Sequence, residues 1–467
     1  MQRIYGSFHI YPTLRLTVYG AAGQIGGNKI LLEGQSRVFL DFGVDFNTRS
    51  KYFSTFLQPR RFALVKDYIA TGVLPSLKGL YEKDEPPFAE AVVITHGHLD
   101  HYGHASLLRP DIPLYMGETT RLLIKARENT KQKSPENLFN KNENHPVEVF
   151  RTSSKLVFED AVIYPVHVDH SIPAAYGLVI ETGEGVLAYT GDLRMHGPKS
   201  EMTHDFVEKC VKMNVETLVI EGTRVDETEV STEDDVRKEL TRVASEVGDR
   251  LVSVVVAMMD FDRLNTVLSV AEKLDRVVAI SLHHANLLTT LKRGGARMNI
   301  PELRDEKLVA FLERRRTGTY SKTDYPSWQT ELIEQIPTVG DEEIRRDQKK
   351  YLLVLSRAED IIKLSDIEPA PGSLFILSTS EAHSEEQMLE EERIHNWVNL
   401  LNLRYKHIHS SGHAPQKDLI KIIEEINPRK VIPVHTLKPT LMKQLLNNSG
   451  LKPVVEEPVQ GRAMDVF

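Results

Sequence analysis

The sequence predicts an α/β protein with more than one domain, and three observations support this. The chain has 467 residues, more than one hydrophobic core usually organises, so two or three domains are expected. Its first part reads as short strands that are separated by glycine turns and end in polar residues. Its middle part alternates continuous apolar strands with helices, which is typical of a parallel sheet.

Composition limits the kinds of site that the chain can carry. With 41% hydrophobic and 27% charged residues, it has the composition of a soluble globular enzyme. The single cysteine, Cys210, excludes an intrachain disulfide framework and a thiolate-rich zinc site. Any bound metal must therefore be held by imidazole and carboxylate groups, and the chain has 18 histidines.

The sequence carries no feature of a secreted or membrane protein. Residues 1–16 do not form a signal peptide, and nowhere do about 18 uninterrupted apolar residues occur. We therefore expect a cytoplasmic protein with no membrane partner. The net charge of −8 does not by itself indicate a nucleic-acid-binding protein, but it allows a basic groove within an acidic whole.

The first block of the chain runs to about residue 205 and consists mainly of expected strands. These strands are 14–18, 29–32, 38–40, 91–94, 162–166, 176–180 and 186–189. Several end at a residue able to bind metal: Asp41, His96, His170 and Asp192. Strand ends that all deliver such residues predict the rim of an active site.

The segment 223–372 has a different character and predicts a second α/β domain. Its helices are expected at 233–247 and 264–274, and its buried strands at 251–258 and 277–282. The charged stretch 302–347 within it is expected to be a solvated helical surface.

The last part of the chain returns to the pattern of the first. Strands are expected at 373–377 and 431–433 and helices at 384–403 and 416–426, followed by a loosely docked tail at 453–467.

The densest set of metal-binding residues directly follows the strand 91–94. Residues 96–101 read HGHLDH, three imidazoles and one carboxylate within six positions. A loop can fold His96 and His98 onto one metal while Asp100 and His101 turn toward a second. Imidazole and carboxylate ligands together suit zinc or manganese.

This HxHxDH run resembles the signature of the metallo-β-lactamase superfamily, and three further stretches resemble its other motifs. Asp41, in LDFG, corresponds to an aspartate that braces the ligand loops without touching metal. His170, in DHSIP, and Asp192, in YTGDL, correspond to a ligand of the first metal and a ligand that bridges both.

The later motifs resemble the β-CASP branch of that superfamily, which acts on nucleic acids. There an acidic residue and two late histidines follow the fourth motif, as Glu221, His413 and His435 do here. The resemblance implies an αββα sandwich with an inserted α/β β-CASP domain. It divides the chain into 1–205, the first part of the metallo-β-lactamase domain, 206–372, the β-CASP domain, and 373–467, the return to the first domain with the RNA-specificity motifs.

The resemblance also implies a role for each of these residues in a site with two zinc ions, manganese being the alternative. His96, His98 and His170 are assigned to one metal, Asp100, His101 and His435 to the other, and Asp192 to both. His413 is the candidate that contacts the scissile phosphate and protonates the leaving oxygen, with Glu221 orienting it. Two metals activate water and neutralise the phosphate, and Asp100 belongs to this catalytic set.

Within the branch, residues 409–414, which read HSSGHA, resemble ribonuclease J. In that family the stretch helps to hold an RNA phosphate, and the positions carried over are His409 and Ser411. The resemblance implies a ribonuclease acting on single-stranded RNA, with 5′-to-3′ exonuclease action and additional endonuclease action, in RNA processing or decay. His435 favours RNA, since DNA-cleaving members tend to have valine there. A homodimer or an RNA-processing complex is the expected assembly.

Residues 378–384 depart from the ribonuclease J pattern, which has serines followed by a Pro-Gly-Asn element. This departure leaves the 5′-phosphate pocket, and with it the exonuclease assignment, open. His383, within this stretch, is interpreted as a local structural residue.

Three other features have two interpretations each. Basic and aromatic residues interleave at 52–68, as in a single-strand-binding surface or an extension packed on the sheet. Asp260, Asp262 and Arg263 either line a groove or begin a helix. His104 is expected to pack near the metal ligands rather than bind metal.

Two other functions compete with the ribonuclease. The first is a DNA nuclease or small-molecule hydrolase, such as a lactonase, on the same metal site, although a small ester needs no long groove. The second is an RNA-binding scaffold with a degenerate site, which the complete ligand set disfavours.

Overall fold

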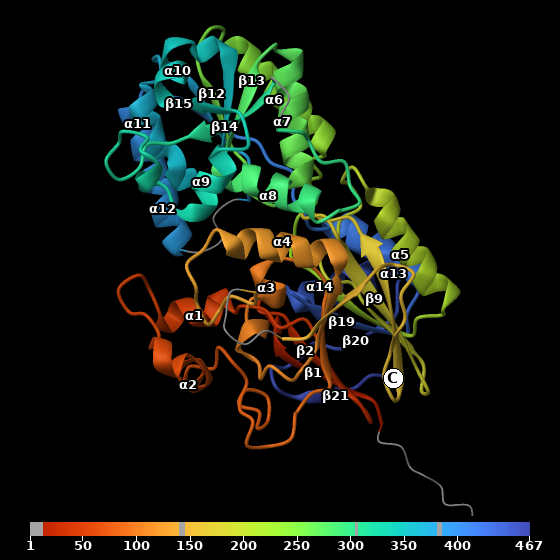
Figure 1. The fold of residues 1–467 in the computed structure, drawn as a ribbon. Helices are drawn as coiled ribbons and strands as arrows, with labels where there is room; N and C mark the ends of the chain where they lie inside the picture. Colours follow the sequence, from red (N-terminus) through yellow and green to blue (C-terminus); the bar gives the residue numbers. More distant parts are fainter. Residues whose placement is uncertain (1–12, 140–144, 304–306, 381–384) are drawn as a thin grey trace, which may run out of the picture.

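The computed structural model describes residues 13–139, 145–303, 307–380 and 385–467. Within them lie three seven-stranded sheets. Two sheets face each other and form a sandwich, and the third lies in a separate layer system, seen at the top of Figure 1. His383 and residues 1–12 lie outside the described residues, so the interpretation of His383 stays a prediction.

The first sheet of the sandwich has the order β21-β1-β2-β3-β4-β5-β6. Its strands are β1 (Arg15–Gly20), β2 (Lys29–Glu33), β3 (Arg37–Leu40), β4 (Ala91–Ile94), β5 (Leu114–Gly117), β6 (Val147–Phe150) and β21 (Ala463–Asp465). The strands β21, β1, β2 and β3 pair antiparallel, whereas β3 to β6 pair parallel.

The second sheet has the order β20-β19-β11-β10-β9-β8-β7. Its strands are β7 (Leu156–Val157), β8 (Ala161–Val168), β9 (Ala175–Thr182), β10 (Val186–Tyr189), β11 (Thr217–Glu221), β19 (Lys430–Val434) and β20 (Val454–Val455). Side chains such as Leu16 and Leu32 from the first sheet meet Leu178 and Ile432 from the second in one buried core.

Helices cover both outer faces of the sandwich. On the first sheet pack α2 (Leu64–Ala70), α3 (Leu99–Tyr102) and α4 (Glu118–Asn129), through residues such as Tyr68 and Ile124. On the second pack α5 (Ser200–Lys212), α13 (Gln416–Ile426) and α14 (Pro439–Asn448), through Phe206, Leu419 and Met442. The predicted αββα sandwich is confirmed.

The third sheet is entirely parallel, in the order β15-β14-β13-β16-β12-β17-β18. Its strands are β12 (Val252–Val255), β13 (Val277–Ser281), β14 (Leu308–Leu312), β15 (Thr338–Gly340), β16 (Tyr351–Leu355), β17 (Leu374–Leu377) and β18 (Arg404–His407). Strands such as β12 and β16 are buried along their whole length because helices cover both faces of the sheet.

The helices on the two faces of the third sheet form two separate cores. One face carries α6 (Glu233–Glu246), α7 (Phe261–Lys273), α8 (Leu282–Arg293) and α9 (Ser327–Ile333). The other carries α10 (Asp341–Arg346), α11 (Leu364–Ile367) and α12 (Glu385–Leu400). Helix α4 of the sandwich contacts α8, and its Leu122 and Leu123 belong to the first of these cores, so α4 joins the two parts of the molecule (Figure 1).

The strand pairings differ from the expected division at residues 206 and 372. Strand β11 follows residue 206 but pairs with β10 and β19 of the sandwich. Strands β17 and β18 follow residue 372 but pair beside β12 in the third sheet. The sequence of a short apolar strand does not indicate which sheet the strand belongs to, because its pairing partners lie far away in the chain.

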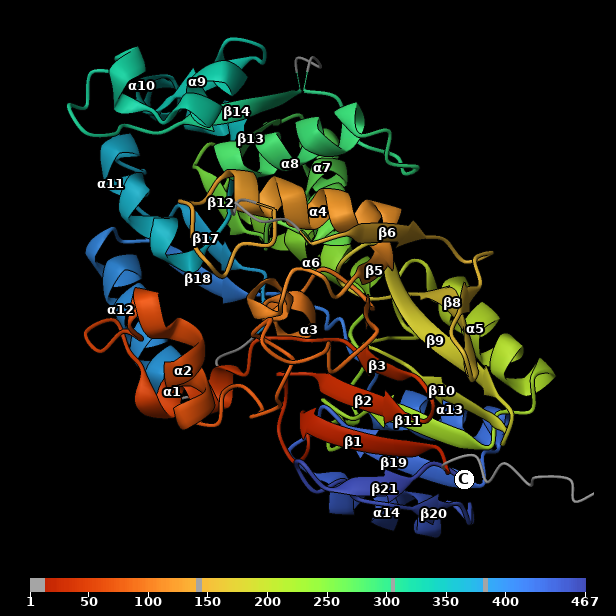
Figure 2. The same cartoon turned by 60° about the horizontal axis from the view of Figure 1, so that its bottom comes forward.

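Two other expectations are wrong. The stretch 302–347 is helical only in part: α9 and α10 lie within it, but so do β14 and β15, the last two strands at one side of the third sheet. The tail at 453–467 is not loose: β21 pairs with β1, and Val466 is fully buried between the sheets. In both Figure 1 and Figure 2, β21 lies beside β1.

Candidate dinuclear metal centre

The predicted ligands meet because strands from both sheets of the sandwich end at one place. His96 follows β4, His170 follows β8, and Asp192 follows β10. Glu221 is the last residue of β11, and His435 follows β19 directly. The parallel pairing of β10, β11 and β19 delivers the last three residues at the same sheet edge.

One group of possible metal ligands consists of His96, His98, His170 and Asp192. The His98 Nδ1 atom lies 3.0 Å from His96 Nε2 and 3.1 Å from His170 Nε2. Burial lowers the pKa of His96 and His170 well below the usual value, which favours neutral rings with a free lone pair. Three converging imidazole nitrogens and a carboxylate are the donor set that Zn²⁺ takes.

The second group consists of Asp100, His101, Asp192 and His435. His435 Nε2 lies 3.1 Å from Asp100 Oδ2, and His101 Nε2 lies 3.1 Å from Asp192 Oδ2. Asp192 belongs to both groups, and its Oδ1 atom is buried without a hydrogen-bond partner in the part of the chain described. A buried carboxylate oxygen with no donor is costly unless a cation binds it, so these residues fit a second metal beside the first.

Asp41 lies behind the ligands and holds two of their loops. Its carboxylate accepts hydrogen bonds from the Thr95 amide (2.7 Å), the Tyr189 hydroxyl (2.9 Å) and His101 Nδ1 (2.7 Å). The last bond fixes which nitrogen His101 presents to a metal. Asp41 does this from a left-handed backbone conformation, at φ 62°.

The glycine of the LDFG stretch, Gly43, is required for steric reasons. A Cβ atom on Gly43 would lie 1.8 Å from the main-chain oxygen of Asp100, so only glycine lets these two loops approach.

Glu221 and His413 form a pair at the open side of the centre. His413 Nδ1 lies 3.0 Å from both Glu221 oxygens, and His413 Nε2 lies 4.0 Å from Asp192 Oδ2. Although burial lowers the pKa of His413, the charges of Glu221 and Asp192 outweigh it and raise the pKa to about 9. Amides of Leu193 (3.1 Å) and Thr223 (3.2 Å) donate to Glu221 and fix its orientation.

The loop that carries His413 also positions the candidate metal ligand His170, a contact that the sequence did not predict. The carbonyl oxygen of Gly412 lies 2.6 Å from His170 Nδ1 and accepts a hydrogen bond from it. That bond directs His170 Nε2 toward the first group. A Cβ atom on Gly412 would lie 2.6 Å from Ser171 Oγ, which explains the glycine.

His409 and Ser411, the predicted phosphate-binding residues, line a cavity of about 590 Å³ beside the centre. The cavity also contains His98, His413 and residues at the carboxyl ends of β12 and β16. Burial and the neighbouring Arg263 lower the pKa of His409 to about 3, so it would meet a phosphate as a neutral hydrogen-bonding group. The hydroxyl of Ser411 accepts the His413 amide at 3.1 Å.

Two buried arginines connect this cavity to the inserted domain. The sequence did not predict the hydrogen bonds that they make. Arg194, two residues after Asp192, donates to Asp262 at 2.8 Å and to Asp169 at 3.2 Å. Arg263 donates to Glu233 at 2.7 Å and to the Ser410 carbonyl at 3.3 Å.

The two interpretations of the segment around α7 are both partly correct. Asp260 caps the amino end of α7 by accepting from the Arg263 amide, and it also lines the cavity. His104 is fully buried and packs against Tyr68 at 5.4 Å, as expected for a packing residue.

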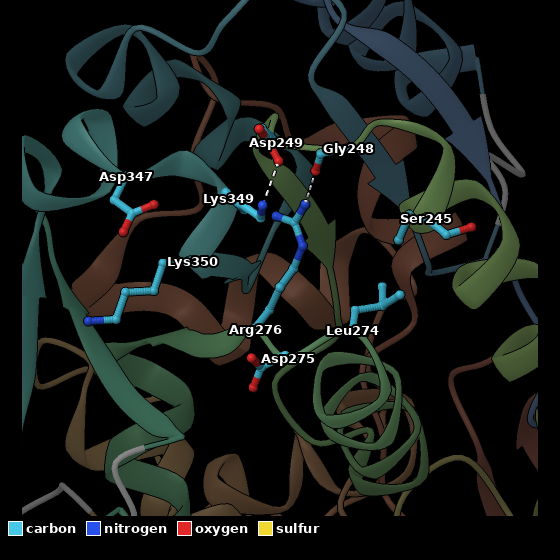
Figure 3. Close-up of a pocket in the computed structure, with 10 residues that line it drawn as sticks. Ser245, Gly248, Asp249, Leu274, Asp275, Arg276, Asp347, Lys349 and Lys350 are labelled. Atoms are coloured by element: carbon cyan, nitrogen blue, oxygen red, sulfur yellow. Dashed lines mark hydrogen bonds and ion pairs between the residues drawn. The ribbon is translucent and has the colours of Figure 1, made fainter.

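A second cavity, of about 400 Å³, lies at the opposite, amino-terminal ends of β12, β13 and β16 (Figure 3). Its Arg276 donates to the main-chain oxygens of Gly248 (2.6 Å), Arg250 (3.0 Å) and Tyr351 (3.0 Å). Because these bonds occupy the guanidinium group, Arg276 serves to tie the strand ends together.

No helix in the described ranges has both the length and the apolar character that crossing a membrane requires.

Comparison with family models gives two matches. Residues 67–252 match a β-lactamase superfamily domain, and residues 401–454 match a Zn-dependent metallo-hydrolase RNA specificity domain. The second match contains His413 and His435, and the first contains the HxHxDH run.

Curated relatives are similar over most of the chain. Ribonuclease J of Mycoplasma genitalium is 25% identical over 82% of this chain and 63% of its own length. Ribonuclease J 2 of Staphylococcus saprophyticus is 23% identical, over 94% of this chain and 72% of its own length. Ribonuclease J2 of Bacillus subtilis is 23% identical, over 90% and 69%. The chain thus spans only about 60% of the first of these relatives.

A crystal structure of a protein of unknown function from Enterococcus faecalis shares the fold. The two structures superpose with a TM-score of 0.73 at 22% identity, over 97% of this chain and 99% of the other. The motifs, the domain matches and these relatives agree: the chain belongs to the metallo-β-lactamase superfamily, as a ribonuclease J-type member of its β-CASP branch.

Proposed function

We propose that this protein is a metal-dependent ribonuclease that hydrolyses phosphodiester bonds of single-stranded RNA. The observation that carries the proposal is the arrangement of two ligand groups that share Asp192, with His413 Nε2 4.0 Å from that carboxylate. The names of the curated relatives support RNA as the substrate.

Two zinc ions, or manganese in their place, would be held by the two ligand groups. When bound there, they would lower the pKa of a water molecule and neutralise the phosphate oxygens. His96, His98 and His170 would hold one ion, Asp100, His101 and His435 the other, and Asp192 both.

His413 is proposed to protonate the leaving oxygen. Glu221 accepts from its Nδ1 atom, so the ring is fixed and Nε2 faces the shared carboxylate, where a scissile phosphate would lie. Glu221 is itself held by two main-chain amides and acts as a positioning residue.

The cavity favours RNA over a small ester. It extends from His98 and His413 to Met258, Met259 and Arg357 at the carboxyl edge of the inserted sheet. Ligands of open parallel sheets bind at that edge, and a chain of nucleotides would fill a space that a lactone would not. His409 and Ser411 are proposed to hold a phosphate there, in 5′-to-3′ exonuclease action with additional endonuclease action.

We further infer that the enzyme works in the cytoplasm in RNA processing or decay, as a homodimer or in an RNA-processing complex. Each of these statements extends the resemblance to ribonuclease J.

The test uses RNAs labelled at either end that carry a 5′-monophosphate, hydroxyl or triphosphate, with matched DNA and a lactone as alternative substrates. Asp100→Ala and His98→Ala should abolish RNA cleavage. Asp205→Ala and His204→Ala, which change exposed residues of the same types on α5, should leave it unchanged. Cleavage that persists in both site variants would refute the proposal.

The products in the same time course test the direction of cleavage. Release of mononucleotides from 5′-monophosphate RNA alone supports the exonuclease assignment, whereas internal fragments support an endonuclease.

A further inference from the structure

Two phenylalanines of the segment 46–66 stand almost entirely in solvent. Phe56 is 98% exposed and Phe62 is 88% exposed. Their neighbours behave differently, since Tyr68 is fully buried and packs against Phe53 at 5.7 Å. The segment is therefore in part an extension packed on the sheet, but two large aromatic side chains gain nothing from burial.

The same segment is strongly basic within an acidic protein. Residues 46–66 contain five basic residues and no acidic one, whereas the whole chain has a net charge of −8. The guanidinium group of Arg60 lies over the Phe62 ring, 5.6 Å from its centroid, and pairs with Asp67. Arg61 donates to the main-chain oxygen of Lys133 at 3.1 Å, and no carboxylate among the described residues forms an ion pair with it.

The segment adjoins the cavity of the metal centre through the end of α4. Arg127, Thr130 and Lys131, at or just after the end of α4, line that cavity together with His98 and His413. The chain that follows carries Lys133, which Arg61 contacts. A line of cationic side chains thus leads from the cavity along the end of α4 to the two exposed phenylalanines.

Contacts with Glu136 fix the segment to the same stretch of chain. The Tyr68 hydroxyl donates to Glu136 at 2.9 Å, and Arg49 lies 3.5 Å from the same carboxylate. In both views α1 (Phe46–Tyr52) and α2 project together from the side of the molecule (Figures 1 and 2).

We propose that Phe56 and Phe62, with Arg60, Arg61 and Lys66, form an aromatic platform that binds single-stranded RNA outside the catalytic cavity. Exposed aromatic rings stack on bases of any sequence, and the adjacent cations contact phosphates. The inference rests on the proposed function, because it takes the same RNA as ligand. A symmetric contact with a second copy is disfavoured, since it would set the same basic segments against each other.

The test measures the affinity of the full-length chain for fluorescent poly-uridine RNAs of about 4 to 24 nucleotides, a span that covers typical single-strand site sizes. Every protein in this comparison also carries His413→Ala, so that the RNA is not cleaved during the measurement. The double variant Phe56→Ala/Phe62→Ala is compared with Val157→Ala/Val454→Ala. These valines are 72% and 63% exposed on other strands.

For the longer RNAs, the phenylalanine variant should bind at least about fivefold more weakly, because each stacked base contributes that much or more. The loss should vanish for the shortest RNAs, and the valine variant should bind like the parent at every length. Arg61→Ala should reduce the slope of log affinity against log salt concentration by about 0.7.

An affinity unchanged at all lengths overturns the proposal. So does light scattering that shows a dimer in the parent and a monomer in the phenylalanine variant, since the rings would then bind a second copy. Length-dependent weakening without RNA cleavage by the otherwise unaltered chain would leave the platform standing and refute the ribonuclease. RNA cleavage by the otherwise unaltered chain, together with an affinity that the phenylalanine substitutions leave unchanged, would refute the platform and leave the ribonuclease standing.

Discussion

Removing the guanidinium group of Arg263 should destabilise the inserted sheet and its helices strongly. Arg263 is fully buried, and its Nη2 and Nε atoms donate to Glu233 at 2.7 and 3.1 Å. Glu233 itself is only 8% exposed. The substitution Arg263→Met keeps much of the side-chain volume but leaves the carboxylate buried without its cation.

The expected cost follows from that uncompensated charge. Removing one partner of a buried ion pair costs about 3–5 kcal/mol, and the hydrogen bond from Thr266 to Glu233 (2.8 Å) recovers only part of it. For a unit of about 150–250 residues, this loss corresponds to a melting temperature lower by about 6–20 °C. Replacing both partners, in Arg263→Met/Glu233→Gln, should restore most of the stability, because neither position then holds an unpaired buried charge.

Urea unfolding followed by circular dichroism measures the parent, the single variants Arg263→Met and Glu233→Gln, and the double variant in one double-mutant cycle. Arg237→Met serves as a matched control, because Arg237 lies on α6, the helix that carries Glu233, and pairs with Asp234 on its exposed side. This substitution should cause no measurable change in stability. Equal stability of Arg263→Met and the parent, or a double variant no more stable than the single one, would refute the reasoning.

Three other outcomes are expected. Asp41→Asn should lower metal affinity about 10–100-fold in a chelator competition, because the amide cannot accept from Thr95, Tyr189 and His101 together; unchanged affinity contradicts the bracing role. His413→Ala should reduce kcat about 100- to 10,000-fold while two metals per chain remain in elemental analysis; loss of metal would instead make it a ligand. Burial raises the pKa of Asp260 from 3.8 to about 6, so its stabilising protonated form is lost as pH rises through about 6. Asp260→Asn, which retains the helix cap, should therefore gain up to about 3 kcal/mol over the parent between pH 4 and pH 8, and parallel unfolding curves would exclude this.

The sequence predicted the sandwich and the candidate ligands through short motifs that resemble those of a known family. The HxHxDH run follows β4 directly, and the other predicted ligands each follow a strand of the sandwich. The structure brings all of them within two adjoining groups. Only the motif order identified His413 and His435, because nothing in their immediate sequence marks a metal-binding residue.

Features that depend on distant pairing were not predictable. Arg194 was not singled out and Arg263 was expected only to line a groove or begin a helix, because their partners Asp262 and Glu233 are 68 and 30 residues away. The strands β14 and β15 lie in a charged stretch, and β14, although apolar throughout, is so short that its sequence alone cannot be told from part of a buried helix.

The pairing of β21 with β1 has a consequence for the order in which the molecule can be completed. Residues 15–17 emerge during synthesis long before their partners at 463–465, and the candidate ligand His435 lies 335 residues after Asp100. Until β19 and β21 have been made, β1 keeps an unpaired edge and the second group of candidate ligands lacks a member. A nascent or truncated chain that lacks β19 and β21 therefore cannot assemble the whole candidate centre, so hydrolytic activity would require both strands to be present.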